Sequence, residues 1–84
     1  METIKMEVEV TDTFGRESNY SWVKRYSEQI PVGTPSREVV RRAKALAGWT
    51  GHRCETDNTG DMYTIRPRRM CQVMFISFKF DGEE

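Results

Sequence analysis

Residues 70–80 read Met-Cys-Gln-Val-Met-Phe-Ile-Ser-Phe-Lys-Phe, the longest run of the chain that is rich in large apolar and aromatic side chains. Strand side chains alternate between two faces, which would place Met74 and Ile76 on one face. Val73 and Phe75 would then lie on the other. A strand with two apolar faces is typical of a sheet that is covered on both sides. What covers the second face is the main question that this stretch raises.

Two strands that form a hairpin are predicted at the start of the chain. Residues 3–11 alternate apolar and polar side chains, which indicates a half-buried strand. Residues 12–18 are rich in turn-forming residues, and residues 19–30 would complete the hairpin. Lys24 interrupts the apolar alternation of this second strand, which predicts a β-bulge near residues 23–25.

One helix is predicted after the hairpin. It would begin with Thr34 as N-cap and Pro35 in the first helical position, and it would end at Gly48. Its apolar stripe has helical spacing and consists of Val39, Val40, Ala43, Leu46 and Ala47. Two short strands at 52–57 and 62–66 would follow before the final strand.

The predicted order ββαβββ indicates one α+β domain over residues 1–84, with an acidic, frayed tail at 81–84. We expect a mixed sheet with one helix packed across one face. The opening hairpin, the crossing helix and a last strand beside the first resemble the β-grasp, or ubiquitin-like, arrangement, in element order alone. The alternative is another two-layer α/β sandwich. A ubiquitin-type tail would end in Gly-Gly, so the ending Asp81-Gly82-Glu83-Glu84 does not imply conjugation.

Composition limits the function classes. The 84 residues carry 13 basic and 13 acidic side chains, and this zero net charge argues against a general nucleic-acid binder. The N-terminus lacks the apolar core of a signal peptide, and no apolar run approaches the ~20 residues that span a bilayer. We therefore expect a complete, cytoplasmic chain with no membrane partner.

Catalytic and metal-binding motifs are sparse. His52, Cys54 and Cys71 are too few and too scattered for a structural zinc site, and the chain contains no phosphate-binding glycine loop. A Cys54–Cys71 disulfide is conceivable only if the third and fifth strands are adjacent. Cys54 with His52 is the one conceivable nucleophile–base pair. We expect a chain that is not an enzyme and has no cofactor, no metal and no small-molecule substrate.

Nucleic acid is one candidate partner, because residues 37–69 hold eight basic side chains against four acidic ones. The proposed anion or nucleic-acid site comprises Arg37, Arg41, Lys44, Arg66, Arg68 and Arg69. Tyr20, Trp22 and Tyr63 would be available to stack on bases. The alternative is that the arginines form a solvated helix face and the aromatic residues belong to the core.

A protein is the other candidate partner, and the sequence favours it. With one helix available, the second face of the sheet would expose Val73 and Phe75, joined by Trp22 or Val23. A homodimer that buries this face, or an edge strand that accepts a partner strand, would cover it. Alternatively, bulges would curl the sheet until the patch closes. We therefore expect a non-catalytic macromolecule-binding domain, such as a small adaptor or inhibitor.

Overall fold

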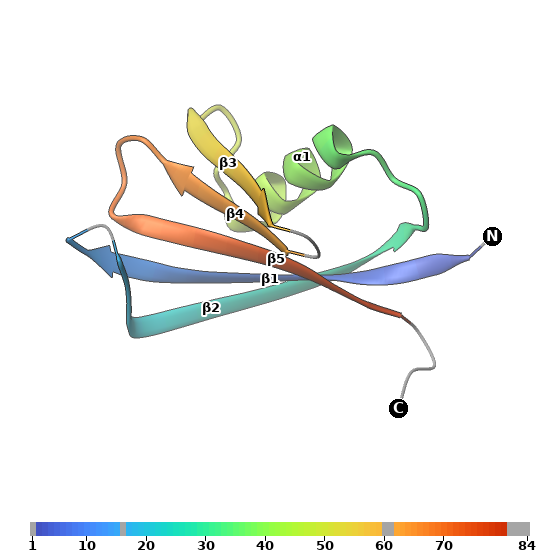
Figure 1. Cartoon of the computed structure of the whole chain (residues 1–84), viewed down its shortest axis with the longest axis horizontal. Coiled ribbons are helices and arrows are strands. Elements are labelled where there is room, and N and C mark those ends of the chain that lie inside the picture. Colours follow the sequence, from blue (N-terminus) through green and yellow to red (C-terminus); the bar gives the residue numbers. More distant parts are fainter. Residues whose placement is uncertain (1, 16, 60–61, 81–84) are drawn as a thin grey trace.

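Five strands and one helix make up the computed structural model of this chain, which describes residues 2–15, 17–59 and 62–80 (Figure 1). The strands are β1 (Thr3–Phe14), β2 (Glu17–Pro31), β3 (Cys54–Thr59), β4 (Met62–Pro67) and β5 (Gln72–Phe80). Helix α1 (Ser36–Ala47) connects β2 to β3. The α+β class and the order ββαβββ are confirmed.

The strands form one sheet in the order β2-β1-β5-β4-β3. β5 lies beside β1, as expected, with Val8 opposite Ile76. All four pairings are antiparallel, so the expected mixed sheet is wrong. The reason is the route of the chain: α1 leads to the far edge of the sheet, and two successive hairpin connections then bring β5 back to its centre. The β-grasp topology is not confirmed.

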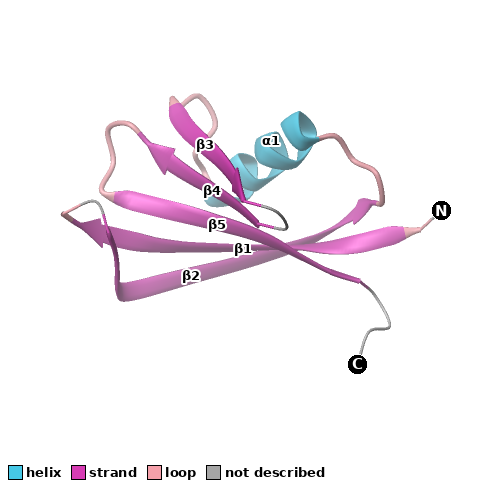
Figure 2. Ribbon diagram, in the orientation of Figure 1, coloured by secondary structure: helices cyan, strands magenta, loops and turns pink. Residues whose placement is uncertain are grey.

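The core lies between α1 and one face of the sheet (Figure 2). Alternate residues of β1, β4 and β5 meet the apolar stripe of the helix there, because side chains two apart on a strand share a face. The buried members are Met6, Val8, Val10, Ile30, Val39, Ala43, Trp49, Ile65, Met74 and Ile76. Trp49, directly after the helix, is a core residue that the helical pattern did not include.

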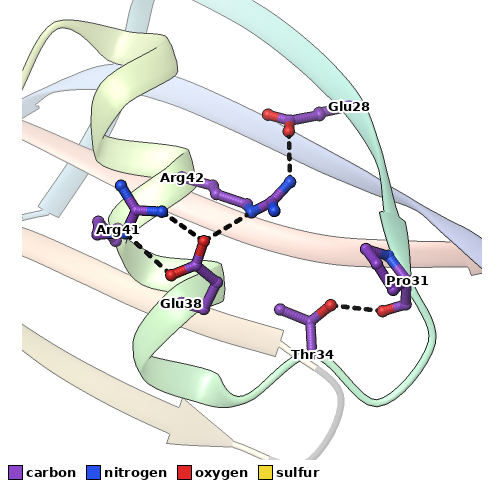
Figure 3. A network of polar contacts seen from close by, with 6 residues as sticks. All are labelled: Glu28, Pro31, Thr34, Glu38, Arg41 and Arg42. Carbon is purple, nitrogen blue, oxygen red and sulfur yellow. Dashed lines mark hydrogen bonds and ion pairs between the residues drawn. The ribbon is translucent and has the colours of Figure 1, made fainter.

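The helix ends where the sequence predicts and begins one residue later. Gly48 adopts the left-handed conformation, with φ 76°, that favours glycine at a helix C-terminus. Pro35 occupies the N-cap position, so the predicted N-cap role of Thr34 is wrong. The Thr34 hydroxyl instead donates to the Pro31 carbonyl oxygen at 2.5 Å, which stabilises the turn between β2 and α1 (Figure 3). At 12 residues, α1 falls short of the length needed to cross a bilayer, and no other helix occurs in the described residues.

The β-bulge of the hairpin lies nearer to the turn than predicted. Thr11 stands opposite Val23, whereas Thr13 stands opposite Ser18. Residues 19–22 of β2 therefore face Asp12 alone. The predicted bulge at 23–25 is wrong, since Lys24 pairs in regular register with Val10.

Candidate functional site

The sheet face opposite α1, called the open face here, exposes less apolar surface than expected. Val73 has 0% of its side chain exposed, so it does not offer the protein-binding surface assigned to it. Phe75 is half-buried and borders a shallow hollow of about 390 Å³ whose lining also includes Glu9 and Arg25. The open face therefore combines a sealed apolar centre with charged side chains.

The bulge lies beside this centre. Thr11 lies opposite both Val73 and Val23, and it is fully buried on the open face. Its hydroxyl accepts a hydrogen bond from the Tyr20 backbone N–H and donates one to the Trp22 carbonyl oxygen, both at 3.0 Å. Residues 20–22 are thereby drawn over Thr11. Closure of the patch by a bulge is the alternative that the structure supports for Val73.

A carboxylate holds the other side of the bulge. Asp12 accepts hydrogen bonds from the Ser21 backbone N–H at 2.9 Å, the Ser21 hydroxyl at 2.5 Å and the Asn19 amide at 3.0 Å. The Ser21 hydroxyl and the Asn19 amide hold the pKa of Asp12 well below its ordinary value of 3.8. The carboxylate is therefore charged at neutral pH, when it accepts all three bonds.

Aromatic side chains gather at this hairpin end. Phe14 is 81% exposed, Tyr20 53% and Trp22 38%, and we call these three residues the aromatic surface. All three come from the last residues of β1 and the first of β2. The ammonium group of Lys24 lies 5.8 Å from the centre of the Trp22 ring, within the range of a cation–π contact. The sequence predicted a binding role for Trp22, but its alternation did not single out Phe14.

Tyr20 has a backbone conformation that side chains rarely adopt. Its φ of 58° lies in the left-handed region, which costs a non-glycine residue roughly 1–2 kcal/mol. The bonds made by Thr11 and Asp12 hold the flanking backbone in place. The bulge thus directs an aromatic side chain outward at a conformational cost.

The basic residues predicted as one site are separated in the structure. Arg41 and Arg42 both donate to the Glu38 carboxylate, and Arg42 also donates to Glu28 on β2 at 2.8 Å (Figure 3). The bonds from Arg41, then Arg42, lower the pKa of Glu38 to about 2. The bond to Glu38 also raises the pKa of Arg41. Arg41 therefore contributes to an ion-pair network within the chain.

Lys44 and Arg68 are brought together at the other end of the helix. With His52 and Arg53 they line a hollow of about 500 Å³. We call this hollow, lined by these four side chains, the basic hollow. Among the described residues that line it, none is acidic. Lys44 Nζ donates to the His52 carbonyl oxygen at 2.8 Å, and the Arg68 backbone N–H donates to the Arg53 carbonyl oxygen at 2.9 Å.

The remaining predicted basic residues lie elsewhere. Arg37 borders a separate hollow beside Tyr63. Arg69 is exposed in the turn after β4, and Arg66 is half-buried on that strand. Arg53, which was not among the predicted basic residues, belongs to the basic hollow because β3 begins next to the turn that carries Arg68. That proximity depends on the pairing of Cys54 with Pro67.

Tyr63 is not a free stacking platform. Its ring packs edge-on against Phe78 with ring centres 6.1 Å apart. Its hydroxyl shares a hydrogen bond of 2.6 Å with the Ser36 hydroxyl at the start of α1. Of the three aromatic residues proposed to stack on bases, Tyr63 is therefore committed to packing within the chain.

Cysteine chemistry has no support in the geometry. Cys54 and Cys71 are both unpaired, and β4 lies between the strands β3 and β5 that would have to be adjacent. Cys54 Sγ donates to the His52 carbonyl oxygen at 3.5 Å. Burial raises the pKa of the Cys54 thiol, although the Lys44 ammonium opposes this shift. A raised pKa leaves less thiolate for nucleophilic attack. The described part of the chain holds no cluster of three or more metal-ligating side chains.

Comparison of the chain with models of known protein families, with curated proteins and with solved structures finds no match.

Proposed function

We propose that this chain is a non-catalytic protein-binding module that contacts its partner through the aromatic surface, Phe14, Tyr20 and Trp22. The observation that carries the proposal is the exposure of these three large side chains on one hairpin end. Burying such side chains against a partner would be favourable by ~25 cal/mol for each Å² of apolar area removed from water. An adaptor or a small inhibitor would need no other functional site.

The bulge makes this surface suitable for binding. Trp and Tyr are enriched among the few interface residues that contribute most of the binding energy. Thr11 and Asp12 hold the backbone of Tyr20 and Ser21 through side-chain hydrogen bonds. A backbone that is already held in shape loses less conformational entropy on binding, which increases affinity.

The charge around the aromatic surface favours protein over nucleic acid. Among the described residues of this hairpin end, Asp12 and Glu17 are acidic, and the basic side chain of Lys24 lies over the Trp22 ring. Phosphate backbones are bound through unbalanced positive charge, which these described side chains do not provide. A protein surface with an apolar pocket and mixed charges around it would match it better.

Capture from the native host with matched variants tests this proposal. Tyr20→Ala/Trp22→Ala removes the two aromatic side chains of the bulge. Val32→Ala removes an apolar side chain that is also exposed, 46%, but lies at the opposite end of β2. We expect a protein that the parent and Val32→Ala both recover and that the double variant loses.

The recovered protein is then produced in pure form and titrated with the three chains. Equal affinity of the parent and the double variant would contradict the proposal. Circular dichroism of the double variant establishes that its fold is retained, so that loss of binding is not a consequence of unfolding.

A second function, anion binding by the basic hollow, is favoured by the arrangement of Lys44, His52, Arg53 and Arg68. These side chains come from α1, from the connection between α1 and β3, and from the turn after β4, and they line one depression. Nucleic acid bound there would lose affinity steeply as salt increases, because each phosphate contact releases counterions. Titration of a single-stranded oligonucleotide at several salt concentrations tests it, with Arg68→Ala as the variant and Arg37→Ala as the control. Binding that Arg68→Ala leaves unchanged would contradict this second function.

A further inference from the structure

The strand β2 has a free edge. It is the outermost strand of the sheet and pairs with β1 on one side. Edge strands present backbone groups that can pair with another chain. The regular part of this edge is short. It begins after the bulge, whose last residue is Trp22, and it ends at Pro31, which has no N–H to donate. Residues 23–28 form the segment considered for pairing, and Tyr26 lies within it.

The register shows which backbone groups point outward. The Val32 N–H donates to the Glu2 carbonyl oxygen at 3.0 Å, so even-numbered residues of β2 direct their backbone groups toward β1. The bond from the Thr13 N–H to the Cys71 carbonyl oxygen agrees, since it directs odd-numbered residues of β1 toward β5. Residues 23, 25 and 27 of β2 therefore direct their N–H and C=O groups away from β1, toward the outer edge of the sheet.

We propose that two copies of this chain pair through this edge, β2 against β2, antiparallel about a two-fold axis at Tyr26. In this register Lys24 of each copy lies opposite Glu28 of the other, and Tyr26 lies opposite its own counterpart. These positions lie between the hydrogen-bonded pairs, where opposing side chains approach most closely. Opposite charges and paired aromatic rings directly across two strands stabilise their pairing. The second copy is the occupant that the charges select.

Neighbouring registers lack this complementarity. Hydrogen bonds between the two copies form only in registers that bring outward-facing residues opposite each other. The two-fold axes of these registers lie one residue apart along β2. An axis at Arg25 would oppose two arginines, and an axis at Lys24 two lysines. An axis at Ser27 would place Glu28 opposite Tyr26 and would form no ion pair. The register about Tyr26 is thus the one with two ion pairs and no like-charge pair.

Surrounding contacts are compatible with this pairing. Glu28 is one-third exposed and already accepts a bond from Arg42, so its carboxylate would be shared by two cations. Lys24 is exposed and extends over the Trp22 ring. Phe14, Tyr20 and Trp22 are outside residues 23–28, so the dimer does not require the aromatic surface. The dimer is independent of the function proposed above.

Charge reversal tests the register. Lys24→Glu would place a glutamate of one copy opposite a glutamate of the other on both sides of the axis. Glu28→Lys would do the same with lysines. Sedimentation of the parent across a concentration series should show a dimer. Each single variant should dissociate at least about tenfold more readily. Arg37→Glu, which makes the same change of charge on α1, should dimerise like the parent.

Mixing the two single variants provides the decisive measurement. Lys24→Glu and Glu28→Lys chains would restore both ion pairs in a heterodimer, although each alone is mainly monomeric. The double variant Lys24→Glu/Glu28→Lys should form a homodimer again. A parent chain that stays monomeric at its highest soluble concentration would overturn the proposal. A dimer that is equally stable in both single variants, or a mixture that does not associate, would also overturn it.

Discussion

Beneath α1, Met6, Ile65 and Ile76 have no exposed surface, whereas at the end of the β1–β2 hairpin Phe14 is 81% exposed. The helix-covered part of the sheet holds its shape by burying apolar side chains. The hairpin end has no helix above it, and the side chains of Thr11 and Asp12 hold its bulge by hydrogen bonds. Stability and the candidate binding surface are therefore located in different parts of this small chain.

This difference has a physical basis. Apolar burial is non-directional and depends on area, so it suits a core that must only be filled. A bulge needs particular backbone groups satisfied, and side chains with oxygen acceptors do this. The effects of substitutions on stability should therefore differ between the two regions, both in magnitude and in physical cause.

The largest effect is expected in the helix-covered region. Ile76→Ala removes a fully buried side chain from the central strand β5. We expect the free energy of unfolding to fall by roughly 2–5 kcal/mol, because a cavity is left in the core. Urea denaturation measures it. A loss below 1 kcal/mol, roughly the value typical of point substitutions in general, would contradict the assignment of this region as the core.

Thr11→Val should have the next largest effect. Valine has nearly the shape of threonine but cannot accept the bond from the Tyr20 N–H or donate to the Trp22 carbonyl. We expect the free energy of unfolding to fall by roughly 1–3 kcal/mol, since two backbone groups lose their partner. Thr64→Val on β4 is a half-buried control. An equal effect of both substitutions would mean that the bulge does not depend on Thr11.

A comparison of Tyr20→Gly with Tyr20→Ala measures the conformational cost of the bulge. Glycine adopts a φ of 58° without steric cost, whereas alanine does not. We expect the glycine variant to be more stable by about 1 kcal/mol. The opposite order in urea denaturation would show that residue 20 does not have this backbone conformation in solution.

The smallest effect on stability is expected from the protonation of Asp12 as the pH is lowered. The pKa of Asp12 is lower in the folded chain than in the unfolded chain, so its contribution to stability is present above pH ~4 and is lost as pH falls. The urea midpoint of the parent should therefore decrease more on acidification than that of Asp12→Asn. Asp57→Asn removes a different exposed carboxylate and is the control. Identical pH profiles for all three chains would contradict the role of Asp12.

Patterns within single elements predicted much of this fold. Alternation identified β1, and helical spacing together with Gly48 identified α1. Strand direction was not predictable in this way, because it depends on how α1 carries the chain to β3. The position of the bulge depends on hydrogen bonds from Thr11 and Asp12 across the hairpin, which the residues of β2 alone do not reveal.

The candidate sites were only partly predictable for the same reason. Trp22 was predicted to join Val73 and Phe75 on the sheet face that the helix does not cover. Val73 has the same strand pattern as an exposed residue would have, yet it is fully buried opposite Thr11, beside the bulge. Lys44 and Arg68 line the same hollow because β3 pairs with β4, whereas Arg41 donates to Glu38 within its own helix.

The most direct test of the central claim is the affinity of the captured partner for the parent, for Tyr20→Ala/Trp22→Ala and for Val32→Ala. Interface aromatic residues of this kind contribute ~2 kcal/mol or more each, so the double variant, which loses two of them, should bind on the order of 1,000-fold more weakly. Val32→Ala should bind like the parent. If the double variant binds as tightly as the parent while retaining its fold, the hairpin end is not the binding surface.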